Sequence, residues 1–301
     1  MFDSYSCRKG KGTLAGVKRV SRFIRACSEN YTHDCYVLKL DIQGFFMSIR
    51  RDLLWDKLYE LIGSNYCQSD KGKLLWLTKL VVMNDCTRDC TIRSDLRKWE
   101  GLPASKSLFH RQDTLCGLPI GNLTSQVFAN FYMSTFDHFV KSQLKVCYYV
   151  RYVDDFLIVH QDKDYLKRLI VTVRDFLLKE LGLTLHPHKI TLQHFGKGVK
   201  FTGAYILPNR IYVERRTKTN FYQTIEKWNK QIRESQRKFT RQEMTHFKQA
   251  VNSSLEFMRH YSTYKLRKKM LYGMSAKFDH YVRPANGYTK LVSNYRYRIA
   301  R

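Results

Sequence analysis

The spacing of apolar residues changes along the chain, and it predicts strands mixed with helices over the first two thirds. Short β-branched and aromatic runs are typical of buried strands. They occur at Cys35–Leu40, Cys147–Tyr152, Phe156–His160, Leu183–His186 and Val199–Leu207. Apolar residues three and four positions apart are typical of amphipathic helices. They occur at Thr13–Ala26, Arg51–Ile62, Lys73–Val82, Val127–Leu144 and Lys163–Leu181. Residues 83–118 are polar and rich in turn residues, which predicts an irregular segment or a β-hairpin.

From Thr217 onward the pattern becomes helical and basic. Three long segments, punctuated by Tyr and Phe, predict helices at Asn220–Lys238, Arg241–His260 and Thr263–Met274. Residues 210–301 hold 22 Lys and Arg but only 6 Asp and Glu. Helices that are basic on one face and aromatic on another suit a nucleic-acid duplex better than a membrane, which favours a cleaner apolar face.

Composition narrows the class of partner. The chain has 301 residues, 44% of them hydrophobic, which excludes a disordered protein and allows a sizeable core. Its formal charge of +27 favours a polyanionic partner, nucleic acid first and an anionic membrane second. No apolar run approaches the roughly 18 residues of a membrane span, and the N-terminus lacks the apolar region of a signal peptide, so we expect a soluble protein. The eight cysteines form no CxxC pair, so we expect reduced thiols in the cytosol.

Acidic residues follow two of the predicted strands. Asp154 and Asp155 are adjacent at the connection between two strands, where their mutual repulsion calls for a nearby cation. Asp41 ends another apolar strand. If these strands are neighbours, the three carboxylates and the Ile42 carbonyl can hold two Mg²⁺ ions about 4 Å apart for phosphoryl transfer. Ordinary turn chemistry and a strand-ending acid are the simpler interpretations, and a nuclease or transposase also uses three acids.

Two glycine-containing segments are candidates for contact with nucleic acid. Residues 3–13 form a basic loop in which Lys9 and Lys11 flank Gly10, so its amides and cations can bind phosphates. The loop lacks the spacing of a nucleotide-binding P-loop, and a solvated basic turn explains it equally well. Gly117–Gln126 contains a Pro-X-Gly sequence at a helix entrance, which brings the backbone close to whatever lies opposite.

The order of these motifs resembles the palm motifs of reverse transcriptases. They are Leu40–Phe46, Pro119–Gly121, Tyr152–Asp155, Lys189 and Phe201–Gly203, and the resemblance covers about residues 3–275. It implies an α+β fold, a right-hand polymerase with an antiparallel-sheet palm, short or truncated fingers and a helical thumb. The implied domains are partial fingers (1–34), a palm (35–216) with finger insertions at about 60–115, a thumb (217–275) and a basic aromatic C-terminal tail (276–301). Family members normally carry more of the fingers before residue 3, so the sequence is either a fragment or has a shorter fingers domain.

Within this superfamily the chain looks most like the reverse transcriptases of diversity-generating retroelements. Two stretches carry this resemblance, Ser4–Thr13 and Leu118–Gln126. Most reverse transcriptases have Gln where this chain has Ile120, and they end the second motif in Ser-Pro where it has Ser125-Gln126. Group II intron, retron and phage-defence enzymes remain rival assignments. The resemblance implies a prokaryotic or phage-encoded cytoplasmic enzyme.

The resemblance also implies residue roles. Asp41, Asp154 and Asp155, with the Ile42 carbonyl, would bind two Mg²⁺ ions, with Mn²⁺ as a substitute. Phe45 and Phe46 would border the incoming nucleotide, with Phe46 as the gate that favours dNTPs over ribonucleotides, and Lys189 would protonate pyrophosphate. The other expected contacts are Ile120 and Gly121 with the nucleotide, and Lys9, Lys11, Ser125, Gln126, Phe201, Thr202 and Gly203 with primer or template. Phe46, Lys189 and Phe201 also have simpler explanations, as core residues or a solvated turn lysine.

We therefore predict an RNA-directed DNA polymerase that copies an RNA template from a DNA or RNA primer with dNTPs. Ile120 lacks the amide that the usual Gln offers, and loss of such a contact removes discrimination of about 1–3 kcal/mol. Error-prone copying at template adenines, which the resemblance implies, is therefore expected to depend on Ile120. A small basic accessory protein is implied as a further partner. The alternatives are a catalytically weak subunit that binds RNA–DNA duplex and a metal-dependent nuclease.

Overall fold

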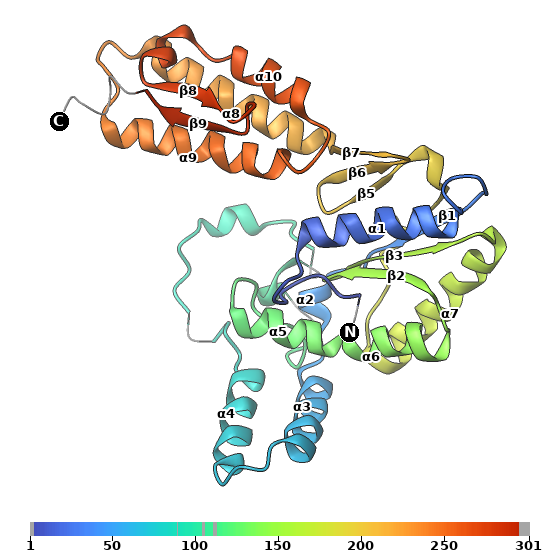
Figure 1. Cartoon of the computed structure of the whole chain (residues 1–301). Coiled ribbons are helices and arrows are strands. Elements are labelled where there is room, and N and C mark those ends of the chain that lie inside the picture. The colour runs from blue at the N-terminus through green and yellow to red at the C-terminus, as the bar shows by residue number, and fades with distance from the viewer. Residues whose placement is uncertain (1–2, 89, 104–105, 111–112, 295–301) are drawn as a thin grey trace. The chain divides into compact units, whose positions relative to one another are not determined.

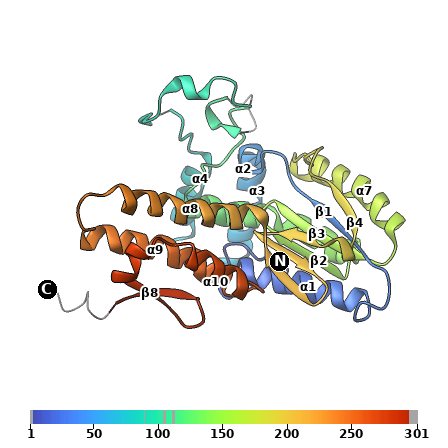
Figure 2. The ribbon, with the colours of Figure 1, turned by 90° about the horizontal axis from the view of Figure 1, so that it is seen from above.

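An antiparallel sheet of four strands lies at the centre of the N-terminal part of the chain. The computed structural model describes residues 3–88, 90–103, 106–110 and 113–294, and the chain divides into two units, Met1–His194 and Phe195–Arg301. The strands of the first unit run in the order β2-β3-β1-β4, and each neighbouring pair is antiparallel (Figure 2). Their bounds are β1 (Tyr36–Leu40), β2 (Tyr148–Tyr152), β3 (Asp155–His160) and β4 (Thr191–His194).

Helices cover both faces of this sheet. Side chains alternate between the two faces along each strand, so each face carries apolar residues that a helix can bury. The helix α1 (Thr13–Cys27) packs against β2 and β3 on one face (Figure 1). On the other face, Leu38 and Phe156 of the sheet share a core with Phe136 and Leu166 of the helices. The helical segments that contribute to this core are α5 (Leu123–Tyr132), α6 (Ser134–His138), a π-helical turn (Phe139–Gln143) and α7 (Lys163–Leu181). The strands β1, β2 and β3 are therefore largely buried, whereas β4 at the edge of the sheet is half-exposed.

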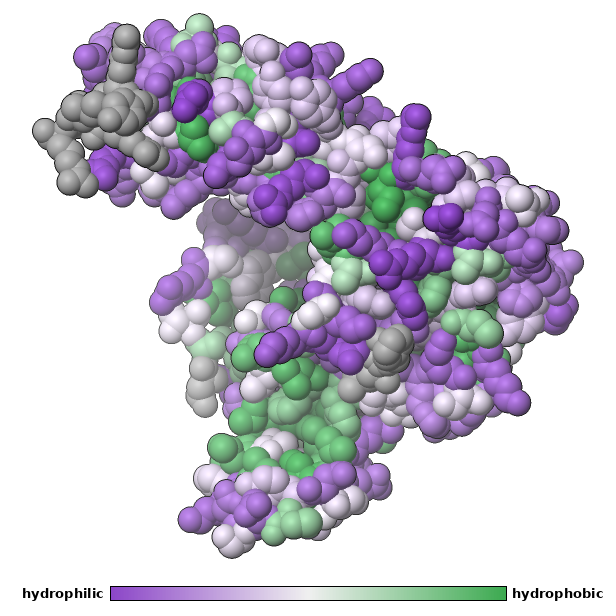
Figure 3. Space-filling view, in the orientation of Figure 1, coloured by the Kyte–Doolittle hydropathy of each residue, from purple (hydrophilic) through white to green (hydrophobic). Residues whose placement is uncertain are grey.

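Three further helices follow the first strand. They are α2 (Phe45–Ser48), α3 (Arg51–Asn65) and α4 (Lys71–Met83), and the last two form an antiparallel hairpin (Figure 1). Apolar side chains stay exposed on this hairpin, where Figure 3 shows a hydrophobic surface. Trp76, at 66% exposure, is the most exposed of them, and the others are Tyr59, Leu61, Leu77, Leu80 and Val81.

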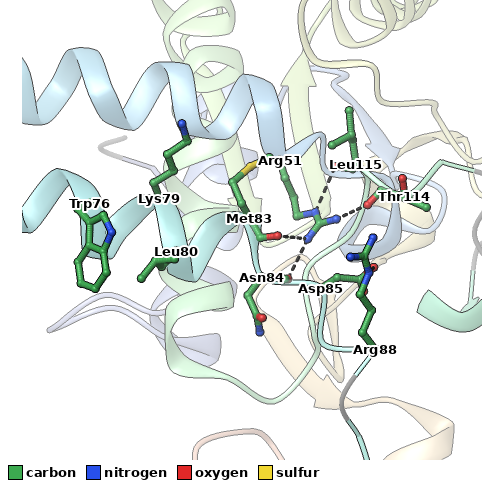
Figure 4. Close-up of a pocket in the computed structure, with 10 residues that line it drawn as sticks. All are labelled: Arg51, Trp76, Lys79, Leu80, Met83, Asn84, Asp85, Arg88, Thr114 and Leu115. Atoms are coloured by element: carbon green, nitrogen blue, oxygen red, sulfur yellow. Dashed lines mark hydrogen bonds and ion pairs between the residues drawn. The ribbon is translucent and has the colours of Figure 1, made fainter.

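The buried guanidinium of Arg51 ties the irregular segment after α4 to the first unit. It donates hydrogen bonds to the carbonyl oxygens of Met83 at 3.0 Å, Asn84 at 2.8 Å and Leu115 at 3.3 Å, and also to that of Thr114 (Figure 4). Between these anchors the described residues form 3₁₀ turns at Leu96–Trp99 and Leu108–His110 and no strand. Of the two alternatives predicted for residues 83–118, the irregular segment is confirmed.

The second unit joins a small sheet to a helical core. Its antiparallel strands are β5 (Val199–Phe201), β6 (Ala204–Leu207) and β7 (Arg210–Val213). The helices α8 (Arg215–Glu234), α9 (Arg241–Met258) and α10 (Tyr264–Tyr272) follow. Phe247 of α9 stacks on Phe278 with ring centroids 4.1 Å apart, in a core that also contains Leu291. Leu291 lies in a hairpin of β8 (Val282–Ala285) and β9 (Lys290–Ser293).

Most predicted elements are confirmed, and several need correction. The helix expected at Val127–Leu144 begins at Leu123 and is divided into α5, α6 and the π-helical turn. The strand expected at Leu183–His186 is wrong, because only Leu185 pairs there, as an isolated bridge with Ile42. The strands β4 and β7 were not predicted. The segment predicted as a tail, 276–301, folds as a 3₁₀ turn and the β8–β9 hairpin as far as Asn294, and residues 295–301 lie outside the described residues.

Candidate active site

The connection between β2 and β3 is a two-residue loop of Val153 and Asp154, since Tyr152 pairs with Asp155. Val153 adopts a positive φ of 57°, which is a strained conformation for a β-branched residue. Such strain persists only where surrounding contacts impose it. Here the guanidinium of Arg151 donates a hydrogen bond from Nη1 to the carbonyl oxygen of Val153 at 3.0 Å.

Arg151 is fully buried and forms the centre of a polar network. Two parallel bonds, both 2.7 Å long, join its guanidinium to the carboxylate of Asp137 in α6. Nη1 also donates to Asn130 Oδ1 at 3.2 Å, while Asn130 Nδ2 donates to the Ser6 carbonyl at 2.6 Å. The backbone of Arg151 pairs with that of Asp3 and Tyr5. The network therefore joins the acidic loop to the N-terminal segment and to the helices behind it.

The three predicted acids converge at the end of the sheet. Leu40 pairs with Phe156, so Asp41 directly follows the position opposite β3 and lies beside the loop. Burial is the largest cause that raises the pKa of Asp154 to about 6, and the negative charges of Asp41 and Asp155 raise it further. Burial also raises the pKa of Asp155, against the opposing effect of Lys39. Asp41 therefore raises the pKa of both loop acids, and Asp155 raises that of Asp154, as expected for three carboxylates that lie near one another at the end of the sheet.

Two lysines offset this negative charge. Lys189 Nζ lies 2.9 Å from Asp41 Oδ1, and this hydrogen bond is the main reason that the pKa of Lys189 is raised. Its side chain is 55% exposed, and its backbone N–H donates to the carbonyl of His186. Lys39 of β1 pairs with Asp155 Oδ2 at 3.0 Å. Lys39 was not predicted as part of the site, although it is the one charged residue in the predicted apolar strand Cys35–Leu40.

The types of donor at this site suit a divalent cation, but the arrangement of the side chains does not. Asp155 Oδ1 is buried and accepts no hydrogen bond, so one carboxylate oxygen of the site has unsatisfied lone pairs. Carboxylate oxygens are the ligands that Mg²⁺ prefers. In the described parts of the chain, however, no three His, Cys, Asp or Glu side chains are arranged as a ligand set. Asp41 and Asp155 are instead paired with lysine ammonium groups, which a bound cation would displace.

A pocket of about 270 Å³ lies beside the acidic loop, and Val153 forms part of its wall. Phe46, Ile120 and Gly121, three of the residues predicted to border a nucleotide, line it together with Gln126. Ile120 is 71% exposed, as expected for a side chain that faces a site rather than the core. The remaining lining residues are Ser6, Cys7, Ala129, Asn130 and Tyr152. Of these, none was predicted as a site residue.

The other predicted site residues do not line this pocket. Phe45 is buried in the core against Phe46, and Ile42 is buried and pairs with Leu185. Ser125 is buried and lines a separate cavity of about 340 Å³. Lys9 is exposed and Lys11 is half-buried, with Lys11 Nζ 4.8 Å from the centre of the Tyr5 ring. A larger cavity, of about 570 Å³, lies around Arg51 and contains none of the predicted residues (Figure 4).

Phe201, Thr202 and Gly203 form the β5–β6 turn of the second unit. Phe201 is fully buried, and Thr202 adopts a positive φ of 45° with a buried hydroxyl that makes no hydrogen bond. Gly203 adopts a φ of 84°, and a Cβ there would lie 3.3 Å from the Phe257 ring. This turn is therefore closely packed against α9 within its own unit.

Residues 1–206 match the family model described as reverse transcriptase (RNA-dependent DNA polymerase). The chain belongs to this family. Two solved structures with a similar fold are the apo telomerase from Candida tropicalis and the telomerase of the same organism in complex with the TWJ fragment of telomeric RNA. Their TM-scores are 0.53 and 0.52, with identities of 13% and 14% over 89% and 92% of this chain.

These identities establish the α+β polymerase fold alone. The chain spans 45% and 42% of the length of those two telomerase chains. No curated protein matches the sequence. Among the described residues, no helix has the length and apolar character required to cross a membrane.

Proposed function

We propose that the chain is an RNA-directed DNA polymerase that adds dNTPs to the 3′-hydroxyl of a primer paired with an RNA template. The observation that carries this proposal is the convergence of Asp41, Asp154 and Asp155 beside a pocket lined by Phe46 and Ile120. A nuclease needs the acids but has no use for a nucleotide pocket next to them. The excess of 22 basic over 6 acidic residues in 210–301 supports a polyanionic partner.

In this proposal, Asp41, Asp154 and Asp155, with the carbonyl of Ile42, would hold two Mg²⁺ ions, for which Mn²⁺ could substitute. When bound, the ions would supply positive charge that stabilises the negative charge of the displacement. Asp155 Oδ1, which is buried and accepts no hydrogen bond, is one oxygen whose lone pairs could bind a cation. Lys39 and Lys189 neutralise the acids until then.

The side chains have separate tasks. Phe46 crowds the position of a ribose 2′-hydroxyl and so favours dNTPs, while Ile120 and Gly121 border the base. Lys189 Nζ carries the proton that leaves with pyrophosphate, because its hydrogen bond to Asp41 keeps it protonated in the resting site. Lys9, Lys11, Ser125 and Gln126 contact primer or template, and the Phe201–Gly203 turn contacts the primer.

We further propose that the enzyme belongs to a diversity-generating retroelement and copies template adenines with low fidelity. The exposed alkyl group of Ile120 in the nucleotide pocket supports this assignment, because it offers no hydrogen bond to a base. The same assignment implies a cytoplasmic enzyme of prokaryotic or phage origin and a small basic accessory protein. A group II intron, retron or phage-defence enzyme is the rival assignment.

Primer extension tests the proposed function. Purified chain is incubated with an RNA template, a labelled DNA primer, Mg²⁺ and dNTPs, and the product is sequenced. Template-directed extension that requires dNTPs is expected. Tight duplex binding without extension would favour a binding subunit, and cleavage of the primer in the absence of dNTPs would indicate a nuclease.

A further inference from the structure

The pocket beside the acids has an apolar wall and few polar groups that remain available. Phe46, Ile120 and Val153 supply most of the apolar wall. Most of the Asn130 amide is engaged, because its oxygen accepts from Arg151 and from the Ser4 hydroxyl, and its nitrogen donates one hydrogen bond to the Ser6 carbonyl. The other polar side chains that line the pocket are those of Ser6, Cys7, Gln126 and Tyr152, and of these only the Gln126 amide carries N–H donors.

The Cys7 thiol orients the amide of Gln126. Cys7 Sγ lies 3.1 Å from Gln126 Oε1 and donates to it, while the Ser6 hydroxyl lies 3.2 Å from the same sulfur. A thiol has one hydrogen and its sulfur is a weak acceptor, so this chain of contacts favours the amide oxygen toward Cys7. Gln126 Nε2, which makes no hydrogen bond among the described residues, then remains as a donor at the pocket. The Tyr152 hydroxyl can either donate or accept, so it does not require the ligand to present an acceptor.

We infer that Gln126 is a nucleotide-binding residue of the pocket, whose amide N–H groups donate to the minor-groove edge of the incoming base. This inference rests on the proposed polymerase function and refines it, because it assigns Gln126 to the incoming nucleotide instead of to the primer or template. Every base carries an acceptor on that edge, N3 of purines or O2 of pyrimidines. A donor placed there strengthens binding of all four nucleotides without reading their identity. The pocket thus combines Ile120, whose alkyl group cannot distinguish bases by hydrogen bonding, with an amide that can donate to any of the four bases.

The most direct test removes the acceptor from the nucleotide. Wild type is compared with Gln126→Leu for incorporation of dATP and of its 3-deaza analogue, which lacks N3. Wild type is expected to favour dATP by about three- to tenfold in kcat/KM, the effect of one hydrogen bond, whereas Gln126→Leu treats the two alike. Gln68→Leu changes an exposed amide between α3 and α4 and should behave as wild type. Equal dATP preference in wild type and Gln126→Leu would overturn the inference.

Two cysteine variants test the orientation of the amide. Cys7→Ser keeps a donor to Gln126 Oε1 and should retain the dATP preference, whereas Cys7→Ala should lower it at least twofold. Equal behaviour of the two variants would contradict the role of the thiol.

A second readout does not depend on turnover. On a dideoxy-terminated primer, the next complementary dNTP should slow alkylation of Cys7 by iodoacetamide, measured by peptide mass spectrometry. Unchanged alkylation in a chain that extends primers would overturn the inference alone. If the chain neither extends primers nor shows protection of Cys7, both the inference and the proposed function are overturned.

Discussion

Arg151 Nη1 donates to the carbonyl oxygen of Val153 at 3.0 Å, and this bond joins a fully buried ion pair to the strained loop that carries Asp154. Removing one partner of a buried pair leaves the other charge uncompensated. Asp137→Asn should therefore lower the free energy of unfolding by about 3–5 kcal/mol, measured by urea denaturation. Lys167→Ala, which breaks the exposed pair with Asp164, should change it by less than about 1 kcal/mol. Similar values for both variants would show that the buried network does not stabilise the fold.

Much of the first unit follows from its apolar pattern. The predicted helix at Lys163–Leu181 has the observed bounds, because Asp162 caps its start and Gly182 ends it with a φ of 60°. The hairpin around Asp154 and Asp155 and the strand before Asp41 were also predicted, since these residues interrupt or end long apolar runs. The apolar pattern alone therefore identifies helices that bury one face and strands that consist of one apolar run.

Residues that act through distant partners were not predictable in this way. Arg151 stands in an apolar strand, which signals a buried partner, but nothing in the sequence identifies Asp137 or Asn130 as that partner. Cys7 likewise enters the pocket only because the N-terminal segment pairs with Arg151. The strand β4 was missed because Thr191–His194 is half-exposed at the sheet edge and has only one large aliphatic residue, Leu192.

The stability of the metal-free protein should depend on Asp154. Its pKa of about 6 in the folded state exceeds the ordinary value of 3.8, so the folded state binds a proton more tightly than the unfolded chain. Stability is therefore lost as pH rises from 4 to above 6, by at most about 3 kcal/mol. Asp154→Asn avoids this loss, so its advantage in urea denaturation with EDTA should grow between pH 4 and pH 8. An advantage that is independent of pH would contradict the raised pKa.

Lys189 should act through its proton as well as its charge. Lys189→Arg can keep an ion pair with Asp41, but a guanidinium does not release its proton in this pH range. We expect both Lys189→Arg and Lys189→Ala to reduce the single-turnover extension rate by about 10²–10⁴, the usual contribution of general acid catalysis. Near wild-type rates for Lys189→Arg would indicate an electrostatic role only.

Ile120 should control fidelity. Ile120→Gln adds a hydrogen-bonding amide to the pocket wall, so misincorporation opposite template adenine should fall by about 5- to 150-fold, equivalent to 1–3 kcal/mol of discrimination. Sequencing of cDNA made on an adenine-rich RNA template measures this rate. Leu123→Gln, at an exposed residue in the first turn of α5 that does not line the pocket, is the matched control. An unchanged error rate in Ile120→Gln would contradict the role of Ile120.

The account depends most on the three converging acids, and single-turnover extension in Mg²⁺ tests them most directly. Asp154→Asn and Asp155→Asn remove carboxylates from the loop, whereas Asp175→Asn removes an exposed carboxylate from α7. The rate of dNTP addition should fall at least 10³-fold in the first two variants and stay at the wild-type level in the third, with duplex binding unchanged in all three. Extension by Asp154→Asn and Asp155→Asn at the wild-type rate would contradict the assignment of this site as the polymerase centre.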